Sequence, residues 1–303
     1  MIVSTPDRPA ASPQASGALA RLDTAWRRRY WRPDPAAISA FDGLRPIVVI
    51  TGASEGIGLA LAHRIAADGH DVMLIARRPP LLNAMAFEIS ARHGVDAIPL
   101  PLDITSPDAL SQIDAALAAA DAYADVLVNS AAIGLSGDFA QHDPADIDRL
   151  VALNVAAATR LTRHCLPGML TRGRGGVLNV ASLGAYAPGP FQASYYASKA
   201  YLLSLTEALA QECLGQGVRL SAVCPGPVAT AFHERMGAAS AWYLRLLPMA
   251  SPRGVAEQAW LGFKLGFRVA LPSLVAPLLA VSLRLLPHRM TVPIIAALLR
   301  PRR

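Results

Sequence analysis

Short apolar runs alternate along the chain with segments long enough to form a helix. Continuous Val, Ile and Leu runs are typical of strands buried on both faces, and helix-length spacers are typical of parallel crossovers. The pattern predicts an α/β fold over residues 46–272, a doubly wound parallel sheet of about seven strands with helices on both faces. The predicted strands are IVVIT (47–51), DVMLIA (71–76), AIPLP (97–101), DVLVN (125–129), GVLNVA (176–181), RLSAVC (219–224) and FRVALP (267–272).

The N-terminal 45 residues do not follow this alternation. Residues 1–18 are rich in Ala, Pro and Ser, a composition typical of disorder. In the next segment one helical stripe, beside several arginines, is formed by Leu19, Leu22, Trp26 and Tyr30. We expect an N-terminal extension at 1–45 whose basic helix packs on its own domain or a second subunit, or lies on a membrane surface.

The C-terminal segment, 273–303, is apolar and basic. A run of 15 uncharged residues separates Arg268 from Arg284, and TVPIIAALL follows after a basic break. Because a spanning helix needs about 20 apolar residues, this run is too short to cross a bilayer. We expect two apolar helices that cover a lipophilic pocket, form a subunit contact or lie in one leaflet.

Charge is concentrated at the two ends of the chain. The 303 residues are 53% hydrophobic and 17% charged, with a net charge of +6. Residues 1–45 hold seven arginines and four acids, and residues 251–303 hold eight basic residues and one acid. Basic ends suit an anionic surface such as lipid headgroups better than a nucleic acid lying across the core. We expect no nucleic-acid partner, and we consider peripheral membrane contact through both ends.

Cysteines and histidines add information about location and metals. Three scattered cysteines are typical of free thiols in a reducing compartment, and the N-terminus lacks a signal-peptide pattern. None of the seven histidines stands at a metal-binding spacing, so we predict no metal site. The expected location is the cytoplasm, peripheral to a membrane if the ends bind one.

The first predicted strand runs directly into TGASEGIG (51–58). Gly52, Gly56 and Gly58 allow a tight turn and let a phosphate approach backbone N–H groups at the positive end of a helix. The same letters match G-x-S-x-G, the nucleophile elbow of α/β-hydrolases, with Ser54 as nucleophile. Such an elbow follows several strands, whereas only one possible helix precedes this one, so we favour phosphate binding.

The second predicted strand ends with two arginines. An acid at this place would bind the ribose 2′-hydroxyl of NAD, but Arg77 and Arg78 stand here. Paired guanidinium groups suit a 2′-phosphate, so NADP is favoured over NAD, unless the two side chains are simply solvated.

The stretch QASYYASKAYL (192–202) places two tyrosines ahead of a lysine. Lys199 is one of only two lysines, and a compact ammonium can hydrogen-bond a ribose and lower the pKa of a neighbouring phenol. On a helix, Tyr195 and Tyr196 both share a face with Lys199, so spacing alone does not separate them.

With Ser182, thirteen residues before Tyr195, and Asn154, the chain resembles the short-chain dehydrogenase/reductase family over about residues 46–265. TGASEGIG looks like TGxxxGxG, Asp103 looks like the adenine-contacting acid, and PGPVAT (225–230) looks like the loop beside the nicotinamide. NSAA (129–132) stands in place of NNAG, a departure that replaces Asn and Gly by Ser130 and Ala132. The tail from VALP onward resembles the branch related to long-chain 3-oxoacyl reductases.

The resemblance implies hydride transfer with a nicotinamide cofactor. Tyr195 would exchange a proton with the substrate, Ser182 would polarise its carbonyl, and Lys199 would lower the phenol's pKa. Asn154 would hold a water linking the lysine to solvent, and Tyr196 would pack or line the pocket. Cofactor contacts are expected from Gly52, Ser54, Glu55, Gly56, Ile57, Gly58, Arg77, Arg78, Asp103, Ile104, Asn129, Ala131, Tyr195, Lys199, Pro225, Gly226, Val228 and Thr230.

The segment at about 231–250 corresponds to the family's substrate lid. It and the loop after Ser182 are rich in apolar residues, which suit a hydrophobic 3-oxoacyl or steroid-like ketone or alcohol. These residues are Tyr186, Phe191, Phe232, Met236, Trp242, Tyr243, Leu244, Leu246, Leu247 and Met249. The family implies a homodimer or homotetramer. The alternative function is a non-catalytic NADP-binding scaffold or sensor of the same fold.

Overall fold

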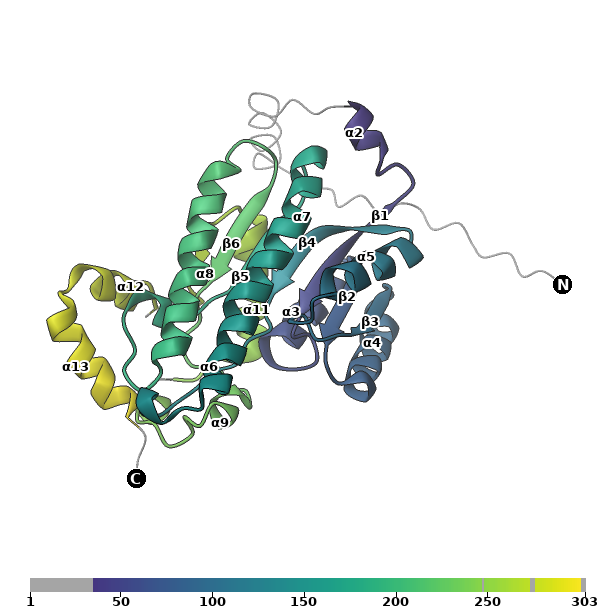
Figure 1. Cartoon of the computed structure of the whole chain (residues 1–303). Helices are drawn as coiled ribbons and strands as arrows, with labels where there is room; N and C mark the ends of the chain where they lie inside the picture. The colour runs from purple at the N-terminus through teal and green to yellow at the C-terminus, as the bar shows by residue number, and fades with distance from the viewer. Residues whose placement is uncertain (1–34, 247, 273–275, 301–303) are drawn as a thin grey trace.

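The computed structural model describes residues 35–246, 248–272 and 276–300. The basic helix expected at 19–32 lies outside these residues, and so does Leu247 of the lid. Within them, seven parallel strands form one sheet in the order β3-β2-β1-β4-β5-β6-β7 (Figure 1).

The strands lie where the apolar runs predict them. Their bounds are β1 (Arg45–Thr51), β2 (Asp71–Ala76), β3 (Ala97–Pro101), β4 (Ala122–Asn129), β5 (Gly176–Val180), β6 (Arg219–Val223) and β7 (Val269–Ala270). Every neighbouring pair is parallel, so each connection has to cross over a face of the sheet. The doubly wound fold of about seven strands is thereby confirmed.

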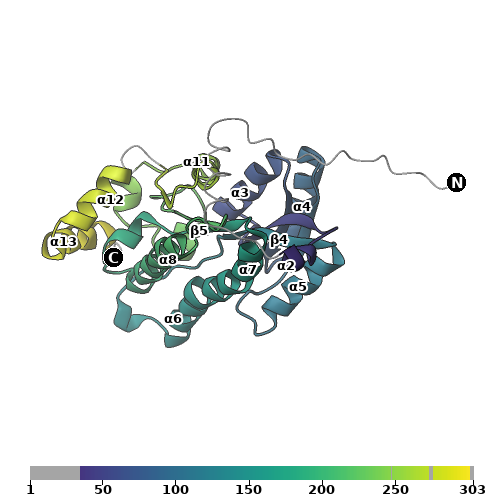
Figure 2. The ribbon, with the colours of Figure 1, turned by 90° about the horizontal axis from the view of Figure 1, so that it is seen from above.

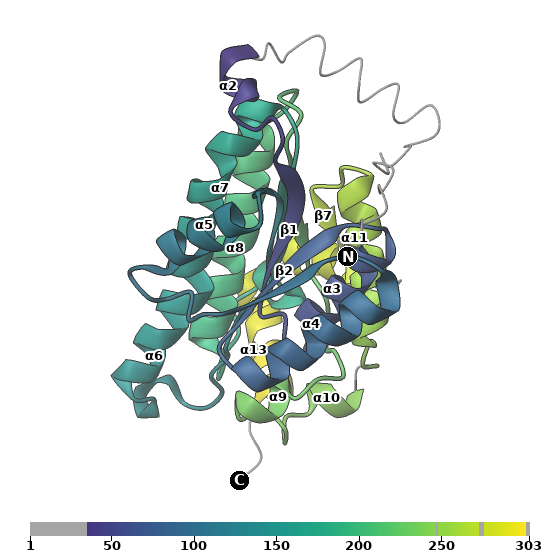
Figure 3. The ribbon, with the colours of Figure 1, turned by 90° about the vertical axis from the view of Figure 1, so that its right-hand side faces the viewer.

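Helices cover both faces of the sheet. Figure 2 shows α3 (Gly56–Ala67), α4 (Pro79–His93) and α11 (Pro252–Lys264) on one side, with α5 (Ala109–Ala119), α7 (Ala158–Arg172) and α8 (Ala193–Glu212) on the other. The smaller helices are α2 (Pro35–Ser39), α6 (Pro144–Val151), α9 (Phe232–Arg235) and α10 (Tyr243–Leu246). In Figure 3, α9 and α10 lie at the end of the molecule opposite α2.

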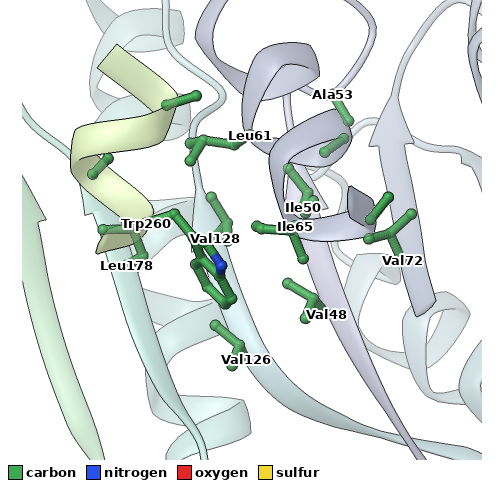
Figure 4. Packing of buried hydrophobic residues seen from close by; sticks show 14 of the residues in the cluster. Val48, Ile50, Ala53, Leu61, Ile65, Val72, Val126, Val128, Leu178 and Trp260 are labelled. Atoms are coloured by element: carbon green, nitrogen blue, oxygen red, sulfur yellow. The ribbon is translucent and has the colours of Figure 1, made fainter. Parts of the chain in front are cut away.

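Alternate residues of each strand point into two separate apolar layers. In β1, Val48 and Ile50 belong to the layer under α3, α4 and α11, whereas Ile47 and Val49 belong to the layer under α5 and α7. Figure 4 shows the first layer, where the Trp260 ring lies beside Val126 and Val128. Each fully buried side chain of this size contributes about 1.5–3 kcal/mol, so the two layers hold the sheet between its helices.

Asp68, at the end of α3, fastens this helix to α11. The Trp260 indole N–H donates to a carboxylate oxygen of Asp68 at 2.8 Å, and the Lys264 ammonium donates to the same oxygen at 2.6 Å. Burial alone would raise the pKa of the carboxyl group, but hydrogen bonds from Lys264, Arg64 and Trp260 outweigh it and lower the pKa to about 2.

The described part of the N-terminal extension packs on the main domain. The Phe41 and Tyr123 rings meet edge to face at 5.6 Å, and the Arg172 guanidinium lies 4.4 Å and 4.1 Å from their centroids. β1 begins at Arg45, within one residue of the predicted start of the domain.

Two further helices, α12 (Ala276–Leu285) and α13 (His288–Leu299), lie at the edge of the molecule beside α8 (Figures 1 and 2). They match the pair of apolar helices expected from the sequence. Among the described residues, no helix combines the length and the apolar character needed to cross a bilayer.

Candidate active site

The glycine-rich turn between β1 and α3 is held tightly against the end of β4. Gly52 has a φ of +67°, and a Cβ there would lie 2.8 Å from the Ala131 backbone. A Cβ on Gly58 would lie 2.2 Å from the Gly52 carbonyl oxygen. The Thr51 hydroxyl accepts hydrogen bonds from the backbone N–H groups of Ser130 and Ala131, at 3.1 Å and 3.2 Å. Glycine is therefore required at 52 and 58 by the fold of the loop itself.

A cavity of about 1620 Å³ opens above this turn at the carboxyl ends of the strands. In an open parallel sheet this is where ligands bind, at the point where the strand order reverses. β1 and β4, on either side of that point, contribute the glycine-rich turn and Ala131. All predicted cofactor and catalytic residues line the cavity, with the exceptions of Asn129 and Asn154.

Basic side chains lie at the end of the cavity formed by β2 and β3. Arg77 and Arg78 directly follow β2, and Asp103 and Ile104 follow β3. Burial acts to raise the pKa of Asp103, but hydrogen bonds from the Thr105 backbone and hydroxyl, with the charge of Arg77, give a net lowering. The end of the cavity thus presents two guanidinium groups and one carboxylate, a donor and acceptor set that fits an adenosine with a 2′-phosphate.

Glu55, inside the glycine-rich turn, binds two arginines. Its carboxylate accepts a hydrogen bond from Arg235 of α9 at 2.7 Å and lies 3.0 Å from the Arg78 guanidinium. The bonds from Arg235 outweigh partial burial, and with Arg78 they lower the pKa of Glu55 to about 2. Arg235 was not foreseen from the sequence, because 180 residues separate it from Glu55.

Tyr195, Ser182 and Lys199 meet at the base of the cavity. Tyr195 and Lys199 come from the first turns of α8, and Ser182 follows β5. The Ser182 hydroxyl hydrogen-bonds the Tyr195 phenol. The Lys199 ammonium donates to the Val180 carbonyl at 2.8 Å and lies 5.7 Å from the centroid of the Tyr195 ring. A proton donor, a second hydroxyl and a buried cation are therefore gathered in one place.

Burial governs the ionisation of these groups. It raises the pKa of the Tyr195 phenol above its ordinary value, with the Ser182 hydrogen bond acting in the opposite direction. It lowers the pKa of Lys199 to about 8. Burial thus keeps the Tyr195 phenol protonated at neutral pH, so that it can donate its proton, and the lowering of its pKa by Lys199 stays a prediction.

Two asparagines differ from expectation because their side chains are buried away from the cavity. Asn154 lies in a π-helical turn (Ala152–Ala157), and its amide exchanges two hydrogen bonds with the Ile133 backbone and donates a third to the Ser198 hydroxyl at 3.1 Å. Both N–H donors of the Asn154 side chain are used within the protein, and the water relay expected at Asn154 stays a prediction.

Asn129, expected to contact the cofactor, instead joins a buried polar ladder. Its amide donates to the Thr162 hydroxyl at 3.2 Å and to the side-chain oxygen of Asn179 at 2.9 Å. Asn179 donates in turn to the Thr206 hydroxyl at 2.8 Å. Asn129 and Asn179 occupy odd-numbered strand positions, which here face the layer under α5 and α7, so the ladder links β4 and β5 to α7 and α8 rather than to a ligand.

Tyr196 packs beside Tyr195. A Cβ on Gly189 would lie 2.3–2.5 Å from its ring, and one on Gly184 would lie 2.9 Å from it. The Tyr195 and Tyr196 rings meet edge to face at 6.2 Å. Tyr196 therefore both packs against the loop after Ser182 and lines the cavity, and its two glycine neighbours are required by the space its ring fills.

The lid begins and ends at one short bridge. The Ala229 N–H donates to the Ala250 carbonyl at 3.0 Å, and the Ala250 N–H donates to the Pro227 carbonyl at 2.9 Å. Within the lid, the ring centroid of Phe232 lies 5.4 Å from that of Tyr195. Phe232, Met236 and Tyr243 line the cavity.

Other apolar residues expected in the pocket lie elsewhere. Trp242, Leu246 and Met249 of the lid are exposed. Tyr186 and Phe191 instead receive arginines of the C-terminal segment, with Arg284 at 5.1 Å from the Tyr186 ring and Arg300 at 5.7 Å from the Phe191 ring.

Part of the cavity wall comes from α12 and α13. Leu279 and Leu283 of α12 and Ile295 and Leu298 of α13 line it, and Leu299 packs with the lid. The spacings 279/283 and 295/298 place each pair on one helical face, a signal present in the sequence. Of the three uses foreseen for these helices, covering an apolar pocket is the one that this contact supports.

Known proteins resemble this chain in sequence. A sequence profile described as short chain dehydrogenase matches residues 46–241. Ketoacyl reductase HetN from a Nostoc species is 37% identical over 182 residues, 60% of this chain and 63% of that protein. Very-long-chain 3-oxoacyl-CoA reductase from Bos taurus is 33% identical over 188 residues, 60% of this chain and 59% of that protein. The chain thus matches less than two thirds of the length of either relative.

Solved structures agree with the sequence match. The structure of a short-chain dehydrogenase from Sphingobium yanoikuyae in complex with NADPH has a TM-score of 0.69 and 34% identity, and the match covers 76% of this chain and 88% of that one. The matched profile spans β1 to the middle of the lid and includes the glycine-rich turn, Ser182, Tyr195 and Lys199. The chain belongs to the short chain dehydrogenase family.

Proposed function

We propose that the protein is an NADP-dependent oxidoreductase that transfers a hydride between the nicotinamide and a carbonyl or secondary alcohol group of a hydrophobic substrate. One observation carries the proposal. The Tyr195, Ser182 and Lys199 group and the glycine-rich turn with Arg77 and Arg78 line one continuous cavity. That cavity has room for a dinucleotide and a substrate together.

The choice of NADP is supported by the adenosine end of the cavity. Arg77 and Arg78 offer planar guanidinium groups for a 2′-phosphate, and the N-terminus of α3 offers backbone N–H groups for the pyrophosphate. The family member from Sphingobium yanoikuyae was solved in complex with NADPH. The remaining cofactor residues predicted from the sequence, Asn129 excepted, border the same cavity.

NADPH, when bound, supplies the hydride. The Tyr195 phenol, which is protonated at neutral pH, donates its proton to the substrate's carbonyl oxygen, and the Ser182 hydroxyl hydrogen-bonds the same oxygen as negative charge develops on it. Lys199, held behind the tyrosine by the Val180 carbonyl, places positive charge close to the phenol as the proton leaves. In the reverse direction Tyr195 accepts the proton of the alcohol.

The hydrophobic substrate is supported by the walls around Tyr195. Phe232, Met236 and Tyr196 line this part of the cavity together with apolar residues of α12 and α13. A long 3-oxoacyl chain or a steroid-like ketone would bury its hydrocarbon part there. Two relatives carry the names ketoacyl reductase and very-long-chain 3-oxoacyl-CoA reductase, which supports the first of these classes.

The proposal is tested with purified full-length protein. NADPH should raise the melting temperature more than NADH does, and NADPH oxidation should be seen with members of a panel of 3-oxoacyl, steroid and aromatic ketones. Absence of both the NADPH-dependent shift and ketone turnover would contradict the proposal. A shift with NADPH but no turnover on any ketone, in the parent and in Tyr195→Phe alike, would instead favour the non-catalytic scaffold.

The hydrolase alternative has little support in the structure. Ser54, its nucleophile, accepts a hydrogen bond from the Arg78 guanidinium at 3.4 Å. No histidine among the described residues hydrogen-bonds Ser54, so it lacks the base that would activate it.

Assembly, domain division and location remain part of this proposal. The family resemblance supports a homodimer or homotetramer, which light scattering after gel filtration would measure. The free state of Cys165, Cys213 and Cys224 supports a cytoplasmic location. The proposed division is an extension at 1–45, a catalytic domain at 46–272 with its lid at about 231–250, and a helical tail at 273–303.

A further inference from the structure

α12 carries apolar residues on nearly all of its sides. Ala276 and Ala280 are buried against the body, and Leu279 and Leu283 line the cavity. The outward stripe is also apolar: Leu278, Val281 and Leu285 are 71%, 55% and 77% exposed. A helix that is apolar all round is normally covered on every side, so the outward stripe of α12 calls for a partner.

α13 repeats this arrangement. Met290 and Ile294, four residues apart on one face, are 55% and 64% exposed, whereas Leu298 and Leu299 face inward. Ile294 also lines the cavity, as does the exposed Leu286 between the two helices. These two residues therefore lie where the cavity meets the surface. We call Leu278, Val281, Leu285, Met290 and Ile294 the outer tail face.

The charges around the outer tail face are positive. Arg289 stands in the first turn of α13, and Arg300 follows this helix. Arg284 is paired with Glu207 at 3.0 Å. From residue 258 to residue 303 the sequence contains no acid. An apolar face with a basic rim is complementary to a bilayer with anionic headgroups.

A second copy of the chain suits this face less well. Contact between two outer tail faces would gather Arg289 and Arg300 of both copies at one interface, and the tail has no acid to pair with them. The helices have 10 and 12 residues, too short to span a bilayer but long enough to lie within its surface. The tail also lies beyond residue 241, where the family match ends.

We propose that the outer tail face docks on the surface of an anionic lipid bilayer, so that the mouth of the cavity at Leu286 and Ile294 faces the acyl chains. Hydrocarbon substrates then pass between the bilayer and the cavity without crossing water. This route for the substrate rests on the proposed function, whereas the docking itself does not.

The test measures co-sedimentation of the full chain with vesicles of phosphatidylcholine alone and of phosphatidylcholine with phosphatidylglycerol. The parent should sediment with the anionic vesicles and much less with the neutral ones, and added salt should weaken the binding. Leu278→Glu combined with Leu285→Glu should lower the partition coefficient about tenfold or more. Arg289→Glu should lower it about two- to fivefold.

Phe87→Glu is the matched control, because Phe87 on α4 is as exposed as Leu285 at 77%. It should leave vesicle binding unchanged. Melting temperature and turnover of a short, water-soluble ketone show that each variant is folded. Turnover of that ketone reports on the proposed function independently of sedimentation.

Three results would overturn the docking proposal. The first is failure of the parent to bind anionic vesicles, and the second is equal binding by the double variant and the parent. The third is a change from oligomer to monomer in the double variant without loss of vesicle binding, which would make the face a subunit contact. If docking is found, a vesicle-borne long-chain ketone should lose turnover in the double variant while the soluble ketone does not.

Discussion

Burial of Lys199 places a positive charge beside Tyr195 and lowers the stability of the folded protein. The lysine ammonium is buried behind Tyr195, and burial lowers its pKa from 10.5 to about 8. In the folded protein the group therefore loses its proton at a lower pH than in the unfolded chain. Between these two pKa values the unfolded chain binds more protons, so the shift costs stability below about pH 8 and the cost disappears as pH rises toward 10.5.

Comparison with Lys199→Met isolates this effect. From pH 7 to pH 10 the free energy of unfolding of the parent should rise relative to that of the variant, by about 2 kcal/mol. Urea unfolding at a series of pH values measures the difference, in which the titration of other groups cancels. A difference that stays constant, or falls, over this range would contradict the assignment of a low pKa to Lys199.

The two adjacent tyrosines should respond differently to loss of the hydroxyl. Tyr195→Phe removes the proton donor and should lower kcat/KM by a factor of about 10² to 10⁴. Tyr196→Phe keeps the ring that packs on Gly184 and Gly189, and should retain most of the activity. Initial rates of NADPH oxidation measure both, and equal loss in the two variants would remove the distinction drawn between them.

At the scale of elements, the ion pairs of Glu55 connect the glycine-rich turn to α9 of the lid. Glu55 also holds Arg78, one of the two guanidinium groups available to a 2′-phosphate. Loss of the Glu55 carboxylate should therefore free Arg78 and strengthen NADPH binding. Loss of Arg235 should leave Arg78 as the only partner of Glu55 and weaken NADPH binding.

Two substitutions separate these effects. Glu55→Gln should tighten NADPH binding about two- to fivefold with little change for NADH, and Arg235→Gln should weaken NADPH binding by a similar factor. Fluorescence titration gives both dissociation constants without turnover. The pair Glu55→Gln with Arg235→Gln should match Glu55→Gln alone, and an additive result would show that Arg235 acts on the cofactor directly.

The contact between α3 and α11 should be sensitive to acid. Because the pKa of Asp68 is lowered from 3.8 to about 2, its contribution to stability is complete above about pH 4 and is lost as pH falls toward 2. Asp68→Asn should lower the free energy of unfolding by about 1–2 kcal/mol at pH 7, and the difference should shrink below pH 4. Guanidinium unfolding at pH 7 and pH 3 checks the sign.

The sequence was sufficient to predict those elements that a single local pattern specifies, such as a strand marked by an apolar run. The central strands are buried on both faces, so an uninterrupted apolar run is enough to locate them, as at 47–51 and 71–76. The residues of the cavity floor follow from motifs that stand at the ends of those strands. The tail helices were also predicted, although their partner was left open between a pocket, a subunit and a membrane.

The direction of polar side chains could not be predicted in the same way. Asn129 and Asn154 belong to the expected motifs, yet their amides hydrogen-bond protein partners 21 to 50 residues away in the sequence. The link from Glu55 to Arg235 likewise needs the lid to be folded over the turn. Such contacts depend on side-chain conformation in a packed structure, which sequence spacing does not specify.

At the scale of the whole molecule, the tail packs on the catalytic domain without being part of its sheet. The described residues of the tail add no strand to the sheet, and they contribute part of the cavity wall. A chain ending at residue 272 should therefore fold and bind NADPH. Its KM for a long-chain substrate should rise about tenfold or more, with little change for a short soluble ketone, because burial of the hydrocarbon part is lost.

Circular dichroism and NADPH titration establish the folding of the shortened chain before KM values are compared. Equal KM increases for long and short substrates would show that the tail positions the catalytic group instead of binding hydrocarbon. Failure of the shortened chain to bind NADPH would show that the sheet needs the tail for its own stability.

The bridge between Pro227–Ala229 and Ala250 has a consequence for how the protein can diversify. The two ends of the lid are already joined, so the sequence between them can change in length at a small entropic cost, about 0.6 kcal/mol for each doubling. A lid of different sequence and length could thus replace the present one between these two ends, while the sheet and the residues around Tyr195 stay unchanged. Substrate range would then evolve, or be engineered, largely independently of the fold.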